Sequence, residues 1–354
     1  MTHDYLITAA APFLPLALDE MGAVARSTEL QGMIGDEIAL IRTDRDLGAM
    51  HGAMQRQPPV FVRHIVPVQA HVDFSGEGEA DLAALRDAAV ALADSGMLRA
   101  DDVFSVQARV VTAVEEQRPF SPYAIAQAIA PTLTERCGAT VDVRNPELVL
   151  SVLATAQQAW LGVSPVAFNR SDWAGGERRF RREAGQLSRA EFKLLEAMEL
   201  FALTVPKGAL ALDLGAAPGG WTRLLLAAGA LVTAVDPAPL DPSLMAHRQL
   251  TPIEDYALPW IEHAHAEGLL YDIIVSDIRM DARDAARLMV AMAPLMHLDS
   301  WALVTLKLPT PDALGMDVAA MLNQALDSLR ARYRTVQARQ LFHNRHEVTV
   351  RVAL

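Results

Sequence analysis

The chain has 354 residues, of which 51% are hydrophobic and 21% charged, a balance that excludes a fibrous or broadly disordered protein. Its formal net charge of −12 excludes a uniformly basic nucleic-acid-binding surface, so any contact with RNA must be local. The single cysteine, Cys137, excludes an intrachain disulfide and a cysteine zinc cluster, and predicts a reducing, cytoplasmic setting.

The first 166 residues alternate between short strands and helices. Apolar and β-branched runs predict strands at 4–9, 37–43, 60–69, 103–111, 139–143 and 147–155. Apolar spacing of about 3.6 residues predicts helices at 79–97 and 122–138, the second closed by Gly138. The pattern indicates two α+β regions, a ferredoxin-like subdomain at 1–70 and a second domain at 71–166.

The clearest break lies at 167–187, which is polar, contains Gly175 and Gly176, and lacks apolar periodicity. This composition predicts a linker. Basic residues gather in and just after it: Arg178, Arg179, Arg181, Arg182, Arg189 and Lys193. A charge run of this kind is usually a solvated surface, and it becomes a phosphate-binding segment if RNA is the partner.

Residues 188–354 form the last predicted domain. Ser188 and Glu191 have the spacing of a capping box, which predicts a helix through Phe201. Strands are predicted at 209–214, 230–236, 249–255, 271–277, 301–308, 334–343 and 347–354, and helices at 219–229, 284–296 and 311–332. Strands that alternate with helices predict an α/β, Rossmann-like, mostly parallel sheet, and the short turn at 344–346 predicts an antiparallel last strand.

The segment LDLGAAPGGWT follows a predicted buried strand and begins a helix. Three glycines permit tight turns and close approach of a ligand: Gly215, Gly219 and Gly220. Their spacing differs from that of dinucleotide and phosphate loops, and alone it could mark only a tight strand–helix connection. Asp236 and Asp255 end the next two strands, where a ribose hydroxyl and an adenine amino group would fit. Together these strand ends favour an adenosine-containing cofactor.

DLGAAPGGWT resembles motif I of the FtsJ-like S-adenosylmethionine-dependent methyltransferases, and the resemblance covers about 188–354. It is closest to bacterial 23S rRNA ribose methyltransferases of the RlmM type, which carry an N-terminal THUMP domain that binds RNA. DVFSVQARVV and NPELVLSVLATAQQAWLG, within 71–166, resemble such a domain. The resemblance implies a class I methyltransferase fold and S-adenosylmethionine as cofactor. The implied cofactor-binding residues are Ser188, Gly215, Ala217, Pro218, Gly219, Gly220, Trp221, Asp236, Asp255 and Asp277.

The same resemblance implies a catalytic Lys-Asp-Lys-Glu tetrad, matched by Lys193, Asp277, Lys307 and Glu347. It implies that Lys307 is the general base, that Asp277 orients its amine, and that the other two position the ribose. Because a lysine is a base only when its pKa is lowered, we expect the two nearby lysines to lower each other's pKa. Each residue alone could be an ordinary strand-end or surface side chain, whereas their joint occurrence in order favours the tetrad.

The expected reaction is methyl transfer to a ribose 2′-hydroxyl of RNA. Asp277 begins the segment DIRM, where enzymes that methylate exocyclic base amines have an N/D-P-P-aromatic turn, and Cys137 lies too early for covalent pyrimidine methylation. The histidines lack metal-ligand spacing, and neither a metal nor a membrane partner is expected. A cytidine of 23S rRNA, before or early in assembly, is the implied substrate. The alternatives are tRNA, another RNA, a small molecule, or a noncatalytic RNA-binding assembly factor.

Overall fold

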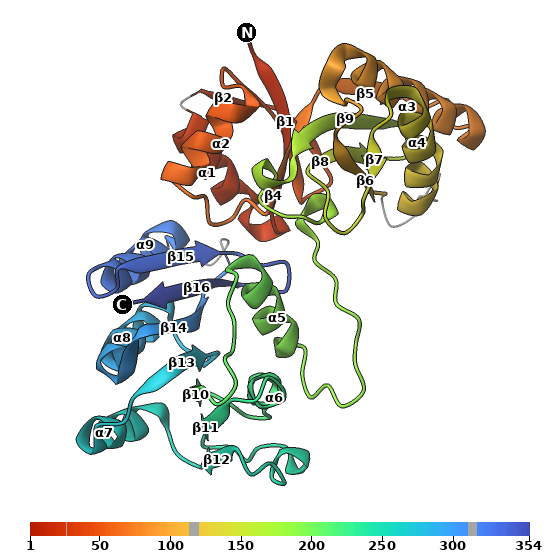
Figure 1. The fold of residues 1–354 in the computed structure, drawn as a ribbon. Coiled ribbons are helices and arrows are strands. Elements are labelled where there is room, and N and C mark those ends of the chain that lie inside the picture. Colours follow the sequence, from red (N-terminus) through yellow and green to blue (C-terminus); the bar gives the residue numbers. More distant parts are fainter. Residues whose placement is uncertain (26, 113–119, 311–316) are drawn as a thin grey trace. The chain divides into compact units, whose positions relative to one another are not determined.

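The computed structural model describes residues 1–25, 27–112, 120–310 and 317–354 (Figure 1). The chain divides into two compact units, Met1–Glu177 and Arg178–Leu354, and each has its own sheets and core. The division falls inside the segment 167–187, and Thr8 donates a hydrogen bond to the Gly175 carbonyl, so the early part of this segment packs on the first unit. The finer domain boundaries stay a prediction. No helix of the described residues is both long and apolar enough to cross a membrane.

The first unit begins with a four-stranded sheet in the order β2-β3-β1-β4. Its elements are β1 (His3–Thr8), α1 (Leu14–Ala25), β2 (Thr28–Ile34), β3 (Ile38–Thr43), α2 (Leu47–Arg56) and β4 (His64–Val68). The prediction of a strand at 60–69 was too long, and β4 tolerates Pro67 because it is an edge strand. The helices α1 and α2 were not predicted. In α1, Pro15 occupies the first turn, where a missing N–H is harmless.

A five-stranded sheet in the order β5-β9-β8-β6-β7 completes the first unit. Its elements are β5 (Ala70–Asp73), α3 (Gly78–Leu92), β6 (Val103–Val110), α4 (Pro122–Cys137), β7 (Thr140–Val141), β8 (Leu148–Ala154) and β9 (Gln158–Pro165). A π-helical segment, Ala93–Met97, extends α3, and Gly138 closes α4 at φ 78°, as predicted. Leu85, Phe104 and Ile129 are fully buried in the core between the helices and the sheet.

The second unit contains a seven-stranded sheet in the order β12-β11-β10-β13-β14-β16-β15. Its strands are β10 (Leu210–Leu214), β11 (Leu231–Val235), β12 (Leu250–Ile253), β13 (Tyr271–Ser276), β14 (Met296–Lys307), β15 (Thr335–Arg339) and β16 (Glu347–Ala353). The strands β10 to β14 pair in parallel, whereas β16 pairs antiparallel with both β14 and β15. The predicted fold class, a mostly parallel α/β sheet with an antiparallel last strand, is confirmed.

Helices cover both faces of this sheet, with α5 and α6 on one face and α7, α8 and α9 on the other (Figure 1). Their bounds are α5 (Ala190–Leu200), α6 (Gly220–Ala227), α7 (Ala257–Glu267), α8 (Ala282–Met292) and α9 (Val318–Arg330). The predicted helix at 311–332 falls partly on 311–316, which lie outside the described residues.

The predicted capping box is only half formed. The carboxylate of Glu191 accepts the N–H of Leu187 at 2.7 Å and that of Ser188 at 3.4 Å, but the cap residue of α5 is Arg189, without a side-chain cap. The reason is packing against α6: a Cβ on Gly220 would lie 2.4 Å from Oγ of Ser188, so this hydroxyl faces the start of α6.

Candidate active site

The carboxyl ends of β13 and β14 and the first residue of β16 meet at one edge of the seven-stranded sheet. Asp277 follows β13, and Lys307 is the last residue of β14. Because β16 runs antiparallel to β14, its register pairs Glu347 directly with Lys307. Lys193 reaches the same point from α5, near the first turn of that helix. The topology therefore gathers four residues that lie up to 154 positions apart, from 193 to 347.

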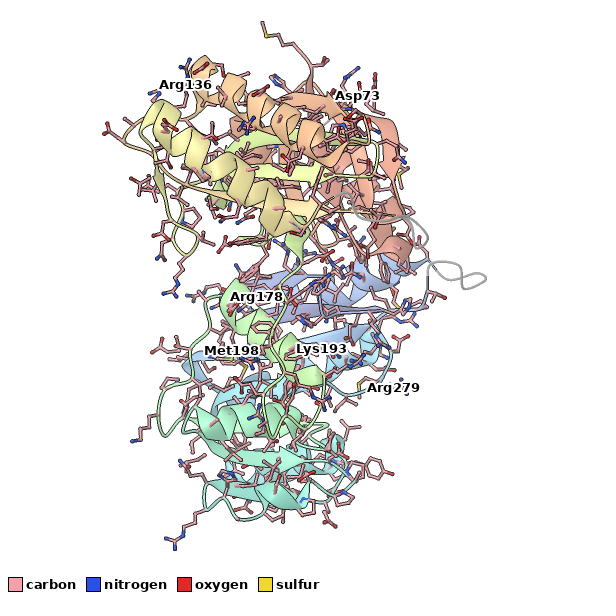
Figure 2. The ribbon with its side chains drawn as sticks, turned by 90° about the vertical axis from the view of Figure 1, so that its right-hand side faces the viewer. Asp73, Arg136, Arg178, Lys193, Met198 and Arg279 are labelled. Atoms are coloured by element: carbon pink, nitrogen blue, oxygen red, sulfur yellow. The ribbon has the colours of Figure 1, made fainter. Side chains whose placement is uncertain are left out.

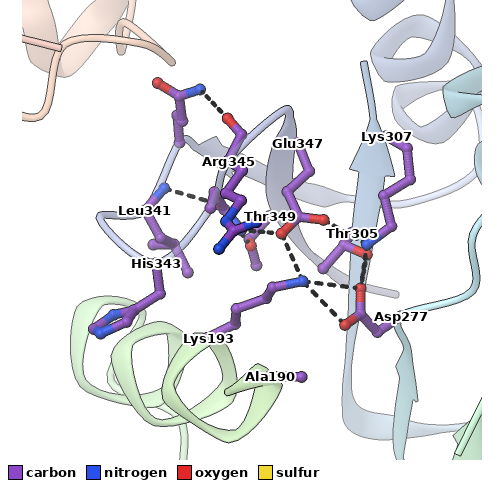
Figure 3. Close-up of polar contacts among 12 residues, drawn as sticks. Ala190, Lys193, Asp277, Thr305, Lys307, Leu341, His343, Arg345, Glu347 and Thr349 are labelled. Carbon is purple, nitrogen blue, oxygen red and sulfur yellow. Dashed lines mark hydrogen bonds and ion pairs between the residues drawn. The ribbon is translucent and has the colours of Figure 1, made fainter. Parts of the chain in front are cut away.

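The four side chains form a closed set of ion pairs, named here the tetrad (Figure 3). The Lys193 Nζ lies 3.1 Å from Oδ2 of Asp277 and 2.6 Å from Oε1 of Glu347. The Lys307 Nζ contacts Oδ1 of Asp277 and Oε2 of Glu347. Each amine thus pairs with both carboxylates, and the four predicted residues are brought together with zero formal net charge.

Neighbouring polar side chains hold the two carboxylates in place. The hydroxyl of Thr305 donates to Oδ1 of Asp277 at 2.5 Å. The amide of Asn344 donates to Oε1 of Glu347 at 3.4 Å, and its carbonyl oxygen accepts from the Thr349 hydroxyl at 3.1 Å. Sequence reasoning missed Thr305 and Asn344, because nothing in their spacing distinguishes them from ordinary strand and turn residues.

Burial and pairing set the protonation of the tetrad. The Lys193 and Asp277 side chains are each 16% exposed. Burial acts to lower the pKa of Lys193, but Asp277 and Glu347 outweigh it and raise that pKa above its usual value. Burial likewise acts to raise the pKa of Asp277, and the Lys307 and Lys193 ammonium groups bring it below its usual value. The expectation of a lowered pKa is therefore wrong for Lys193, because the two carboxylates separate the amines.

A first cavity of about 1000 Å³ opens at the ends of β10, β11 and β13. Four predicted cofactor-binding residues line it: Gly215, Ala217, Asp236 and Asp277. The Asp236 carboxylate accepts the Ala217 N–H at 3.0 Å and the Ala238 N–H at 2.8 Å, which fixes its position and leaves lone pairs for further donors. Apolar and aromatic side chains also line it, namely Tyr256, Leu258, Pro259, Ile278, Met280 and Leu288, together with the charged Arg279, Asp284 and Arg287.

A second cavity of about 810 Å³ lies on the other side of the tetrad. The residues that line it are Arg189, Ala190, Phe192, Lys193, Arg279, Lys307, Leu308, Phe342, His343, Arg345, His346 and Glu347. Figure 2 labels Lys193 on α5 and Arg279 on the segment after β13, both of which border this cavity. Because Asp277 and Arg279 line the first cavity, the tetrad stands where the two cavities meet.

Each of the two units contains a segment that matches a known protein family. Residues 186–298 match the family described as FtsJ-like methyltransferase, and residues 79–164 match the THUMP domain. The chain carries both domains. The family match ends before Lys307 and Glu347, so the membership of these two residues in the site rests on the contacts described above.

Similar proteins include the ribosomal RNA large subunit methyltransferases M of two bacteria. That of Halorhodospira halophila is 33% identical over 55% of this chain and 54% of its own length. That of Azotobacter vinelandii is 34% identical over 59% of each chain. The chain spans little more than half the length of these curated relatives. Among solved structures, TrmN from Thermus thermophilus is 18% identical, with a TM-score of 0.40 over 99% of this chain and 100% of that one.

Other residues predicted to bind the cofactor lie outside the lining of the first cavity in the methyltransferase domain: Ser188, Pro218, Gly219, Gly220, Trp221 and Asp255. Trp221 is 4% exposed and donates from its indole nitrogen to the Ala190 carbonyl at 2.7 Å, so it joins α6 to α5. Asp255 is exposed, and its carboxylate accepts the Tyr256 N–H. Their contacts with a cofactor stay a prediction.

Sequence reasoning also missed Asp213. Its side chain lies within β10, is 1% exposed, and accepts a hydrogen bond from the Thr222 hydroxyl at 2.7 Å. Burial raises the pKa of Asp213 from 3.8 to about 7, against the Thr222 hydrogen bond and with further help from the Asp277 charge. An acidic residue inside the apolar strand LALDL was the available signal, because a carboxylate is rarely buried without a role.

Within the described part of the chain, no three His, Cys, Asp or Glu side chains are grouped as metal ligands.

Proposed function

We propose that the chain transfers a methyl group from S-adenosylmethionine to a ribose 2′-hydroxyl of RNA. The observation that carries the proposal is the tetrad at the junction of the two cavities. Asp277 lines the first cavity, and both tetrad lysines, which pair with it, line the second. This arrangement suits a methyl donor on one side and a hydroxyl acceptor on the other.

The first cavity fits S-adenosylmethionine by the chemistry of its lining. Asp236, held by two backbone N–H groups, has lone pairs left for the ribose hydroxyls of the cofactor. Gly215, at φ 76°, lets the backbone approach a ligand, and the apolar wall around Leu258 and Ile278 suits an adenine ring. When bound there, the cofactor would supply an electrophilic methyl group to the cavity that Asp277 lines.

Within the tetrad, the two lysines have different proposed roles. The raised pKa of Lys193 keeps that amine protonated, so it serves as a fixed cation that orients Asp277 and Glu347. By the family resemblance, Lys307 would be the general base: it would take the proton from the 2′-hydroxyl as the oxygen–methyl bond forms and the methyl–sulfur bond of the cofactor breaks, leaving a neutral thioether. Holding the hydroxyl in line with the methyl group contributes much of the acceleration, and the two carboxylates anchor the amines for that purpose.

The named relatives support ribosomal RNA of the large subunit as the substrate. We propose a cytidine of 23S rRNA, bound before or early in assembly, in the cytoplasm. The boundaries 1–70, 71–166, 167–187 and 188–354 describe the proposed domains. The THUMP domain and the arginines of the linker would supply the phosphate contacts that a chain of net charge −12 cannot make uniformly.

The proposal is tested by transfer of tritiated methyl groups from S-adenosylmethionine to unmodified 23S rRNA and to bulk tRNA. We expect label in 23S rRNA, recovered after alkali as a resistant dinucleotide, because a methylated 2′-oxygen cannot attack the neighbouring phosphate. Lys307→Ala is expected to lower kcat by about 10²- to 10⁴-fold, the usual contribution of a general base.

The matched control is Lys207→Ala, which removes an exposed lysine of the same domain and should keep full activity. Label in tRNA would mean that the reaction is as proposed but that the substrate is tRNA. Cofactor binding without transfer to any RNA would contradict the proposal and favour a noncatalytic RNA-binding factor.

A further inference from the structure

One wall of the second cavity is aromatic. Phe192 of α5 and Phe342 and His343 of the loop between β15 and β16 line it. The Phe192 ring lies 5.2 Å from that of His343. Phe180 stacks behind Phe192, with ring centroids 5.7 Å apart and an interplanar angle of 14°. The wall is thus a supported cluster of rings that come from three separate segments of the second unit.

A buried carboxylate fixes this wall to α5. The Glu196 side chain is 11% exposed and accepts three hydrogen bonds from the loop. These come from the N–H of Phe342 at 2.8 Å, the N–H of His343 at 3.0 Å and Nδ1 of His343 at 2.7 Å. Glu196 lies three residues after Lys193, so one helix carries both a tetrad amine and the anchor of the aromatic loop. Figure 3 shows His343 beside α5, with Lys193 extending toward Asp277.

Exposed cations border the same cavity. Arg189, Arg279 and Arg345 all line it and are exposed. Among the described residues, none of these three guanidinium groups forms an ion pair with a carboxylate, in contrast to Arg178, Arg223 and Arg283. In a chain with an excess of acidic residues, three unpaired arginines around one cavity indicate an anionic ligand.

We infer that the base of the acceptor nucleotide is bound in the second cavity, stacked on the wall of Phe192 and Phe342 that Glu196 positions. The inference rests on the proposed function and adds how the acceptor is held. A nucleotide has three chemically distinct parts, and the cavity has a matching surface for each. The tetrad amines meet the ribose hydroxyl, the bordering arginines meet phosphates, and the ring cluster is left for the base.

Stacking on a ring without base-specific hydrogen bonds predicts a distinct pattern of specificity. Every base has an aromatic face, so this wall would orient the acceptor base without selecting which of the four bases it is. We therefore expect the wall to set the alignment of the 2′-hydroxyl with the methyl donor, and the remainder of the RNA to select the position.

The test uses the full chain and two 23S rRNA fragments, one intact and one in which the acceptor nucleotide keeps its ribose but lacks its base. We expect the wild type to lose at least about 10-fold in kcat/KM on the abasic RNA, the usual effect of one lost base stack. On intact RNA, the kcat/KM of Phe342→Leu should be lower than that of the wild type by a similar factor. On abasic RNA, the two proteins should have almost the same kcat/KM, because the stacking contact is already missing. Its affinity for S-adenosylmethionine should match that of the wild type, which shows that the domain is folded.

Two further variants sharpen the test. Glu196→Gln should show the Phe342→Leu pattern, because it replaces one of the two acceptor oxygens that hold the loop and keeps every ring. Phe180→Leu, which alters a ring outside the cavity lining, should have a smaller effect. If Phe342→Leu lowers kcat/KM by the same factor on intact and on abasic RNA, the inference is overturned and the proposed function still stands. Absence of transfer to intact RNA by the wild type would overturn the proposed function and, with it, the inference.

Discussion

The two cavities of the methyltransferase domain are built in different ways. The first is lined by residues that directly follow parallel strands, such as Ala217 and Asp236, and by residues of the neighbouring helices α7 and α8. The second is made by long side chains from a helix, a strand end and a late loop, among them Lys193, Lys307 and Phe342. Under the proposed function, the cofactor would thus be met mainly at the strand ends, and the acceptor by side chains that distant segments bring together.

Asp277 lines the first cavity and pairs with the two lysines that line the second, so its substitution should affect both cavities. Asp277→Asn keeps the shape and removes one of the two negative charges that hold the lysines. We expect kcat to fall by about 10²-fold or more, the scale of a misplaced general base, and cofactor affinity to fall as well. Isothermal calorimetry and methyl-transfer rates measure the two effects. A variant with normal turnover would show that the tetrad charges are structural only.

Gly215→Ala should damage the first cavity through the backbone. Its φ of 76° disfavours a side chain, and a Cβ there would lie 2.7 Å from Cγ1 of Ile278. Gly208 offers the control, with φ at 79° and open space around its Cβ position. We expect Gly215→Ala to lower the free energy of unfolding by about 1 to 3 kcal/mol more than Gly208→Ala does, which is the usual cost of crowding. Equal costs in urea unfolding would mean that backbone strain alone matters.

Asp213 is buried in β10 and does not line the first cavity, so its substitution tests the interior of the domain and not the surface of the cavity. Because its pKa is raised from 3.8 to about 7, the folded chain holds a proton that the unfolded chain releases between these values. Stability from this group is therefore present at low pH and is lost as the pH rises through that window. Asp213→Asn removes the effect, so its unfolding free energy should gain up to about 1.4 kcal/mol per pH unit relative to the wild type. Parallel pH profiles from pH 5 to 7 would contradict this.

The smallest expected effect concerns the rim of the second cavity. Arg279→Ala should weaken RNA binding a few-fold and reduce the slope of log affinity against log salt concentration by about 0.7 to 0.9, the range for one lost phosphate contact on single and double strands. Arg330→Ala is the control, because this guanidinium pairs with Asp327 at 3.0 Å. Filter binding over a salt series measures both slopes. An unchanged slope for Arg279→Ala would place the phosphates elsewhere.

The sequence was most informative where local pattern and tertiary structure agree. The strands of the seven-stranded sheet were predicted because apolar runs alternate with helices, and the order of Lys193, Asp277, Lys307 and Glu347 could be matched before the fold was known. The raised pKa of Lys193 could not be predicted, because it depends on carboxylates 84 and 154 positions away in the chain.

Other features had no local signal. The strand β9 was missed because its residues, Gln158–Pro165, lack clear alternation and are buried almost throughout. The aromatic wall was missed because Phe192 and Phe342 lie 150 positions apart, and each resembles an ordinary core residue. From the sequence alone, Glu196 is likewise indistinguishable from a surface carboxylate of a helix, because the loop that it anchors lies far away in the chain.

Under the proposed function, methyl transfer would depend on the register in which β16 pairs antiparallel with β14. Glu347 faces the lysines only in the register that pairs it with Lys307. A slip of one residue would send every side chain of β16 to the opposite face of the sheet, so Glu347 would leave the tetrad and Val348 would replace it. A chain with this error could still bind the cofactor, because β10 and β11 are unaffected. Under the proposed function, turnover per bound cofactor would therefore fall in proportion to the fraction of molecules with the wrong register.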